Sequence, residues 1–131
     1  MNFLLLLSSS AHSPVARRAL RFAEAALQSG HRIERIFLYQ DAVHLASKLL
    51  VAPQDEIKIA QQWQALILEH RIDAVVCIAT ALRRGVLDGS EAQRYELDAS
   101  NLAEGYVLSG LGQLHEAMQQ TDRLIHFRGQ A

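Results

Sequence analysis

An unbroken apolar run, Phe3 to Leu7, opens the chain, and Ser8 to Ser10 follow it directly. A strand with one solvent-facing side alternates apolar and polar side chains, whereas a strand covered on both faces does not. The lack of alternation therefore favours a strand buried within a parallel sheet. Parallel strands are joined by long crossovers, usually helices, so this run predicts an α/β architecture for the chain around it.

A helix is expected immediately after this run. Ser13 is a suitable N-cap, Pro14 suits the first helical position, and apolar residues then recur at helical spacing as far as Leu27, before Gly30 as a C-cap. The same alternation of strand and helix continues along the chain. The expected strands are Phe3 to Leu7, Ile33 to Tyr39, Ala74 to Cys77, Tyr106 to Leu108 and Asp122 to Phe127. The later helices are expected at about Asp41 to Leu50, Glu56 to His70, Ala81 to Arg84 and Leu111 to Met118.

This pattern predicts a three-layer α/β fold with a mostly parallel five-stranded sheet, flavodoxin-like or Rossmann-like. Residues 1–131 are expected to form a single domain, because a chain of this length supports one hydrophobic core. Dinucleotide-binding folds carry a glycine-rich turn after the first strand. The corresponding loop here contains no glycine, and we expect no cofactor.

Charge and cysteine content exclude several classes of function. The net charge of −1 gives no general attraction to nucleic acid or to an anionic membrane, so neither is an expected partner. The single cysteine excludes an internal disulfide and a cysteine-rich metal site, and no metal is expected. A lone thiol suits a reducing compartment, and the first apolar run is too short for an export signal or a membrane span. We therefore expect a cytoplasmic protein.

That lone cysteine, Cys77, ends the third expected strand. Sites in open parallel sheets lie beyond the carboxyl ends of the strands. We expect Thr80 to cap a short helix that carries Arg83 and Arg84, and a helix N-terminus with nearby arginines favours a thiolate. Cys77 is therefore a candidate nucleophile for sulfur or acyl transfer. The alternative is structural, since a cysteine in an apolar strand is often a small buried hydrophobe.

The loop after the first strand supplies the supporting candidates. His12 is a candidate base for Cys77 if the first and third strands are neighbours. Ser9 and Ser10, with Ser8, offer hydroxyl and amide donors to an anionic substrate or a persulfide. An ordinary solvated turn is the alternative for all of them. The polar stretch from Leu87 to Asn101, in which Ser90 can cap a short helix, is expected to cover the sheet edge or to meet a partner.

The segment Cys77-Ile78-Ala79-Thr80-Ala81-Leu82-Arg83-Arg84-Gly85-Val86 resembles the active-site segment of the DsrE family. Leu108-Ser109-Gly110-Leu111-Gly112 and the closing Asp122-Arg123 with its strand extend the resemblance over essentially the whole chain. Members of the family often carry glycine in the loop after the first strand, where this chain has serines. The resemblance implies a DsrE-like fold. The difference in the loop does not affect the match at the cysteine.

The resemblance further implies a sulfurtransferase subunit in which Cys77 carries sulfur as a persulfide. The implied relay leads to 2-thiolation of the wobble uridine of certain tRNAs or, alternatively, serves dissimilatory sulfur oxidation. The implied partners are two small paralogous subunits in a heterohexamer, with upstream and downstream sulfur-carrier proteins. Because the chain has no second cysteine to form an internal disulfide, the sulfur must pass to another chain.

Two further functions stay open at this point. In one, the chain is a non-catalytic assembly subunit and Cys77 is structural. In the other, it binds a small ligand in a pocket beside the first loop, and binding would survive Cys77→Ser.

Overall fold

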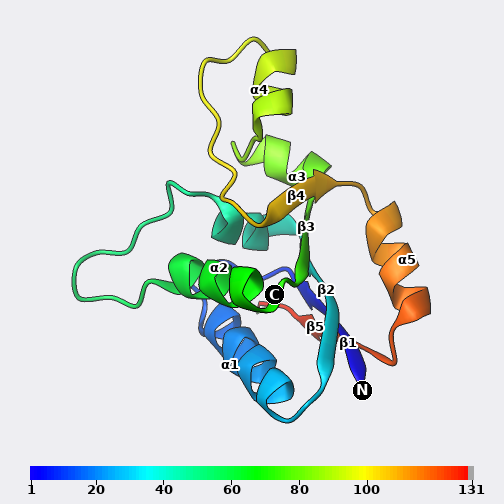
Figure 1. Ribbon diagram of the computed structural model, residues 1–131. Helices are drawn as coiled ribbons and strands as arrows, with labels where there is room; N and C mark the ends of the chain where they lie inside the picture. Colours follow the sequence, from blue (N-terminus) through cyan, green and yellow to red (C-terminus); the bar gives the residue numbers. More distant parts are fainter. Residues whose placement is uncertain (130–131) are drawn as a thin grey trace.

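The computed structural model describes residues 1–129 and has the alternating strands and helices predicted from the sequence (Figure 1). Its strands are β1 (Asn2–Leu7), β2 (Arg32–Leu38), β3 (Asp73–Cys77), β4 (Tyr106–Ser109) and β5 (Arg123–Phe127). Its helices are α1 (Pro14–Gln28), the 3₁₀ helix η1 (Gln40–Ala46), α2 (Ile59–His70), α3 (Ile78–Arg83), α4 (Gly89–Arg94) and α5 (Gly112–Gln120). None of the helices within this part of the chain is long and apolar enough to cross a membrane.

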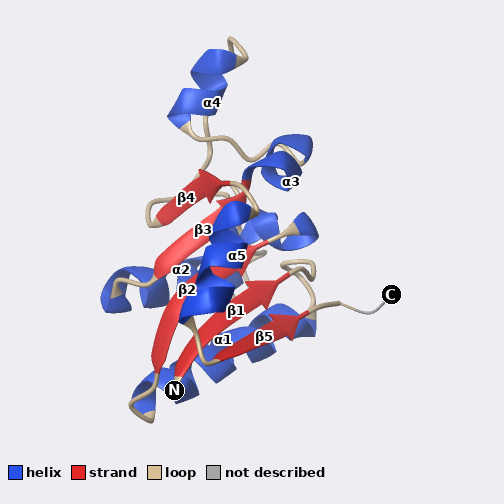
Figure 2. Cartoon of the chain, turned by 90° about the vertical axis from the view of Figure 1, so that its right-hand side faces the viewer, coloured by secondary structure: helices blue, strands red, loops and turns tan. Residues whose placement is uncertain are grey.

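The strands form one sheet in the order β4-β3-β2-β1-β5, and every neighbouring pair is parallel. The unbroken apolar run of β1 lies inside the sheet, between β2 and β5, and helices cover both faces of that sheet (Figures 1 and 2), which explains why the run shows no polar alternation. The predicted α/β fold with a five-stranded parallel sheet is confirmed.

The two faces of the sheet are covered unequally. Strands β1 to β4 step in one direction across the sheet, and the chain then returns past β1 to β5. Right-handed crossovers therefore place α1 and α2 on one face and α5 on the other, as Figures 1 and 2 show. We call these the two-helix face and the one-helix face.

The large hydrophobic core fills the two-helix face. Trp63 and Ile67 of α2 pack there with side chains of β2 and β3 that point the same way, such as Ile36 and Val76. On the one-helix face a smaller buried cluster consists of Phe37, Val75 and Cys77, with partly buried Leu6, Tyr39 and Leu114 against it.

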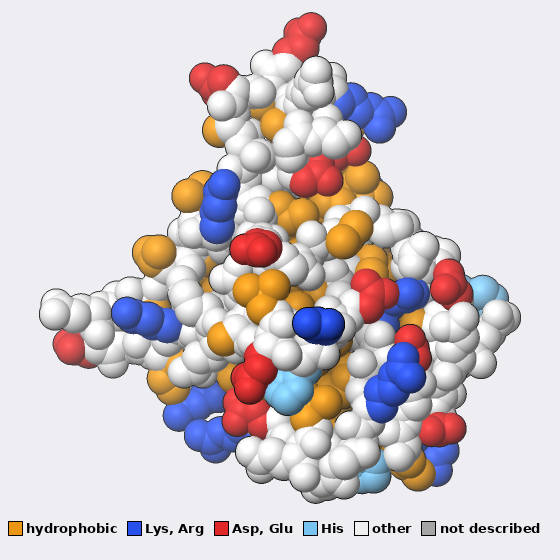
Figure 3. Space-filling view, viewed as in Figure 1, with side chains coloured by type: hydrophobic (Ala, Val, Ile, Leu, Met, Phe, Trp, Pro, Cys, Tyr) orange, Lys and Arg blue, Asp and Glu red, His pale blue; other side chains and the backbone are white. Residues whose placement is uncertain are grey.

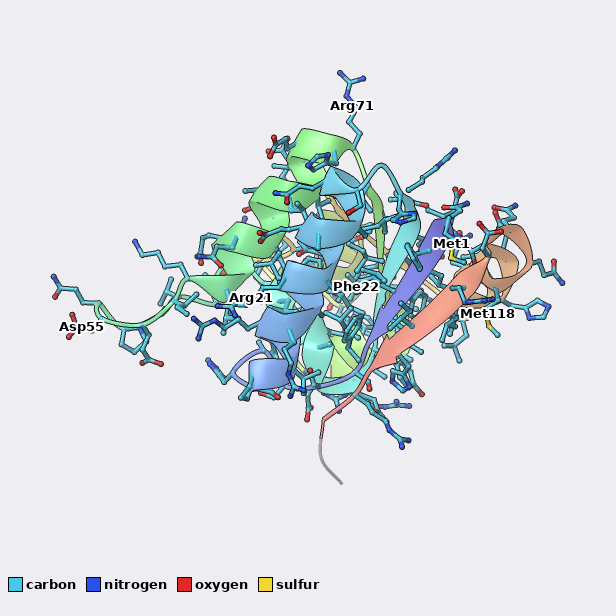
Figure 4. The ribbon with its side chains drawn as sticks, turned by 90° about the horizontal axis from the view of Figure 1, so that it is seen from below. Met1, Arg21, Phe22, Asp55, Arg71 and Met118 are labelled. Carbon is cyan, nitrogen blue, oxygen red and sulfur yellow. The ribbon has the colours of Figure 1, made fainter. Side chains whose placement is uncertain are left out.

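Helix α1 begins as predicted. The Ser13 Oγ accepts a hydrogen bond from the Val15 N–H at 3.1 Å, and Pro14 occupies the first turn. After the helix, Gly30 has a φ of +83°, a conformation that glycine adopts without strain. Phe22 of α1 points to the sheet (Figure 4), where its ring lies edge-on to that of Phe3 at 5.3 Å.

The segment between β2 and α2 differs from the expectation. The predicted helix from Asp41 to Leu50 is the shorter 3₁₀ helix η1, and α2 begins at Ile59 rather than near Glu56. The intervening residues form a projecting loop that carries Asp55 (Figure 4).

Residues 84–105 project beyond the sheet as an arm that contains α4 (Figure 1). Asp88 caps α4, because its Oδ1 accepts from the Glu91 N–H at 2.8 Å; the predicted cap, Ser90, lies inside the helix. Asn101 fastens the base of the arm, accepting from the Leu87 N–H at 2.9 Å and donating to the Gly85 carbonyl at 2.9 Å.

Candidate functional site

The crossovers that follow β3 and β4 leave the sheet on opposite faces. Helix α3 follows β3 and contacts η1 on the two-helix face, whereas α5 follows β4 and lies on the one-helix face. The ends of these two strands are in register, with Cys77 opposite Ser109. Open parallel sheets bind ligands where neighbouring crossovers part. Cys77 therefore occupies the position in this sheet at which the topology opens a site.

The side chain of Cys77 lies inside the molecule. It is 3% exposed and belongs to the cluster with Phe37 and Val75, against which Leu114 of α5 packs. The sulfur of the isolated chain is therefore covered, and exchange with a cysteine of another protein requires a rearrangement.

Helix α3 starts directly after Cys77, with no intervening loop. Cys77 itself is the N-cap, in an extended conformation, and its side chain makes no capping hydrogen bond. The prediction that Thr80 caps the helix is therefore wrong, because Thr80 lies within α3. Its buried Oγ1 instead accepts from the Gln40 N–H at 3.2 Å and donates to the Cys77 carbonyl at 3.4 Å. Thr80 thus connects the start of α3 to the start of η1.

The two arginines of this segment have different surroundings. The Arg84 Nε donates to Asp41 Oδ1 at 2.8 Å, and its guanidinium also reaches the Thr80 carbonyl at 3.3 Å. Asp41 therefore neutralises the charge of Arg84, and this ion pair connects the end of α3 to η1. Arg83 is exposed on α3 and forms no ion pair within residues 1–129.

The predicted pairing of His12 with Cys77 is wrong. It required β1 and β3 to be neighbours, and β2 lies between them. Two strand spacings amount to about 10 Å. His12 is exposed and faces the projecting loop after η1, where it lines a hollow together with Glu56 and Ile57.

Ser9 and Ser10 lie at the same edge of the sheet as Cys77 but on the far side of β2, in a separate cleft of about 840 Å³. We call it the serine cleft: its walls include Ser8, Ser9, Ser10 and Ser13 after β1, with His126 and Arg128 at the end of β5. The Ser8 Oγ lies 2.8 Å from the His126 Nε2. Partial burial, and then the charge of Arg128, lower the pKa of His126.

Sequence reasoning missed several of these residues. Asp41, His126 and Arg128 each follow a strand or lie near its end, so the carboxyl edge was their expected position. Their grouping depends on the strand order, and nothing in the sequence pattern shows that β5 lies beside β1.

No group of three or more metal-ligating side chains is arranged to hold a metal ion within the described residues. Asp88 and Glu91, the nearest pair of carboxylates after Cys77, belong to the capped start of α4.

Hydrophobic side chains are exposed in the middle of the face in Figure 3, over the region where Figure 1 draws β4 and α2. Val107 of β4 is 56% exposed, and Leu111 at the start of the crossover to α5 is also exposed. Both residues are close in sequence to Ser109, the register partner of Cys77.

Comparison with known proteins links this arrangement to a family. The profile of the DsrE/DsrF-like family matches residues 1–127. The sulfurtransferase TusD homolog of Pseudomonas aeruginosa is 55% identical over 129 residues, covering 98% of each chain. The putative sulfurtransferase DsrE of Allochromatium vinosum is 46% identical and covers 83% of this chain and 84% of its own. The crystal structure of the YchN protein from E. coli has the same fold, with a TM-score of 0.72 at 18% identity over 97% of this chain and 100% of that one.

Proposed function

The chain belongs to the DsrE/DsrF-like family and is a sulfurtransferase, and from this premise we propose that Cys77 carries the transferred sulfur as a persulfide. The observation that carries the proposal is the position of Cys77 at the parting point of the β3 and β4 crossovers. It is also the only cysteine of the chain. In a protein that transfers sulfur, Cys77 is the one thiol available as a carrier, and it lies where the sheet opens.

The proposed reaction has two balanced steps. The Cys77 thiolate attacks the terminal sulfur of a donor persulfide, the donor's S–S bond breaks, and the donor leaves as a thiolate. An acceptor thiolate then attacks the terminal sulfur of the Cys77 persulfide, and the Cys77 thiolate is regenerated. The oxidation states balance without another redox partner, because one zero-valent sulfur passes from thiol to thiol.

The burial of Cys77 makes access part of this proposal. Leu114 of helix α5 packs against the cluster that contains the thiol, and α5 also contacts the neighbouring strand β2. A partner that shifts α5 or the loop after β4 would expose the sulfur for exchange and cover it afterwards. The thiol of such a carrier would be reactive within a complex and protected outside it.

We propose that this complex is a sulfur relay. Its members would be two small paralogous subunits, of the TusB/TusC or DsrF/DsrH kind, in a heterohexamer, with an upstream donor and a downstream acceptor protein. Family membership supports this proposal, as do the exposed Val107 and Leu111 beside the parting point. Because the net charge is −1, we propose no direct contact with nucleic acid or a membrane. We also propose that the relay operates in the cytoplasm.

For the end point of the relay, we propose 2-thiolation of the wobble uridine of tRNA, supported by the relatives named TusD. Sulfur carriage in dissimilatory sulfur oxidation is the second candidate, favoured by the 46% identical relative named DsrE. Expression of this chain in a bacterium that lacks its own TusD separates the two. Restored 2-thiouridine in tRNA supports the first, and unchanged tRNA with normal expression and complex assembly supports the second.

Mass spectrometry of the intact chain tests the carrier role of Cys77. After incubation with a persulfide-charged donor protein, the chain should gain the mass of one sulfur atom, and a thiol reductant should remove it. Cys77→Ser should gain nothing while its circular dichroism spectrum stays native. Because the thiol is covered, the measurement is repeated with the paralogous subunits present. If no adduct forms with any donor in that complex, the chain is an assembly subunit and Cys77 is structural.

A further inference from the structure

The serine cleft contains hydroxyl groups that donate to nothing within residues 1–129. The Ser10 Oγ accepts from the His12 N–H at 3.2 Å, and the Ser13 Oγ accepts from the Val15 N–H at 3.1 Å. Each oxygen is thus used as an acceptor, while its own proton has no described acceptor. The cleft therefore offers hydrogen-bond donors without matching acceptors.

Ser9 differs from Ser10 and Ser13 because its hydroxyl has no partner at all among the described groups. It is 2% exposed, it lies in the wall of the cleft, and its Oγ has no hydrogen-bond partner among the described groups. A buried hydroxyl without a partner destabilises a fold, and most buried polar groups are paired for that reason. A ligand in the cleft that brings acceptor atoms would supply the missing partner.

The charges around the cleft favour a negative ligand. Arg128 contributes a full positive charge, and His126 is a second donor, which becomes cationic when protonated. The N-terminus of the 15-residue helix α1 lies at Ser13, and its first turn contains no acidic residue to offset the dipole. Asp41 also lines the cleft, but its carboxylate is paired with Arg84 at 2.8 Å.

We propose that the serine cleft binds a small oxyanion of the sulfate, thiosulfate or phosphate class. Its oxygens accept from the hydroxyls of Ser9, Ser10 and Ser13, and Arg128 balances its charge. An oxyanion fits because it presents acceptor oxygens on several sides, which complements the free hydroxyl protons. The site lies across β2 from Cys77 and does not use the thiol, so it stands independently of the persulfide role.

The test is a calorimetric titration of the full-length Cys77→Ser chain with sulfate, thiosulfate and phosphate at constant ionic strength. Removal of the thiol separates anion binding from sulfur chemistry. We expect saturable binding of at least one anion, and Arg128→Gln should weaken it about tenfold through loss of a charged contact. The matched control is Arg123→Gln, an exposed arginine at the opposite end of β5, which should bind as before.

Ser9→Ala supplies a readout that a structural role would not give. We expect weaker anion binding together with an unchanged or higher melting temperature without anion, because the variant removes an unpaired buried hydroxyl. The anion that binds most tightly identifies the ligand class, with thiosulfate indicating a sulfur compound and phosphate a phosphorylated one.

Three results would overturn the proposal. They are no saturable binding of any of the three anions in the millimolar range, equal loss of binding in Arg128→Gln and Arg123→Gln, or a Ser9→Ala chain that binds normally and unfolds at a lower temperature.

Discussion

The two faces of the sheet differ in how they are held. On the two-helix face, α1, α2 and η1 enclose an apolar core that includes Trp63, Val43 and Leu45. On the one-helix face, α5 covers a small cluster and is held in part by a polar clamp. The side chain of Arg35 reaches Asp73 at 2.7 Å and the Gln113 carbonyl of α5 at 2.8 Å. Apolar burial is thus concentrated on one face, and the thiol lies in the smaller cluster of the other, against which α5 packs.

This contrast suggests why Cys77 lies where it does. A cover held by a few apolar contacts and one polar clamp opens at lower cost than a packed core does. The carrier role proposed for Cys77 requires a thiol that is protected at rest and reached on demand. The unequal faces allow both within one small sheet.

The largest expected effect is on the two-helix face. Trp63→Ala should lower the free energy of unfolding by about 3–5 kcal/mol, because it empties a large buried volume and removes the indole N–H bond to the Ala16 carbonyl at 3.1 Å. Urea unfolding measures this loss of stability. Leu68→Ala, an exposed change on the same helix, is the control and should cost well under half as much. Equal losses would mean that α2 contributes mainly through its own helicity.

A smaller effect on stability, with a distinct effect on the thiol, is expected on the one-helix face. Arg35→Met should cost about 1–3 kcal/mol, below the usual cost of breaking a buried pair, because Asp73 is 47% exposed and can be rehydrated. With α5 less firmly held, Cys77 should react faster with a neutral thiol reagent under native conditions.

Arg32→Met is the control for that variant. Arg32 is exposed on the same strand and pairs with Glu34 at 3.4 Å, a surface contact of small value. It should leave both stability and thiol reactivity nearly unchanged. If Arg35→Met lowers stability without accelerating the thiol reaction, α5 is not the cover that controls access.

The smallest effect concerns Tyr106, whose hydroxyl is buried against the two-helix core without a partner among the described groups. Burial raises the pKa of Tyr106 far above its usual value. Below about pH 10, the usual tyrosine pKa, both folded and unfolded chains keep the proton. At higher pH only the unfolded chain loses it, so stability falls as pH rises.

Tyr106→Phe should therefore be nearly neutral at pH 7 and should lessen the alkaline loss of stability. Urea unfolding at pH 7 and at strongly alkaline pH measures both. Tyr95→Phe, an exposed change in the projecting arm, is the control and should keep the wild-type alkaline profile. A large loss at pH 7 in Tyr106→Phe would show that the hydroxyl has a stabilising partner.

The sequence was sufficient for the elements whose signals are local. Ser13 and Pro14 set the start of α1, and the apolar run of β1 indicated a strand covered on both sides. The position of Cys77 at a strand end also followed from its neighbours. These features depend on residues within one turn or one strand of each other.

Features set by contacts between distant segments could not be predicted in the same way. The pairing of His12 with Cys77 failed because strand order decides which loops meet. Thr80 resembled a helix cap, but its hydroxyl bonds to Gln40, which lies 40 residues away in the sequence. The meeting of His126 with Ser8 likewise depends on β5 joining the sheet beside β1.

The short outer strand β4 has a further consequence. It is first in the strand order, so one of its edges pairs with no other strand of this sheet. Such an edge can template pairing with strands of other molecules, which leads to aggregation. Here the strand is limited to four residues between Gly105, with a φ of +100°, and Gly110. The exposed Val107 thus lies on a strand whose open edge is too short to nucleate a growing sheet.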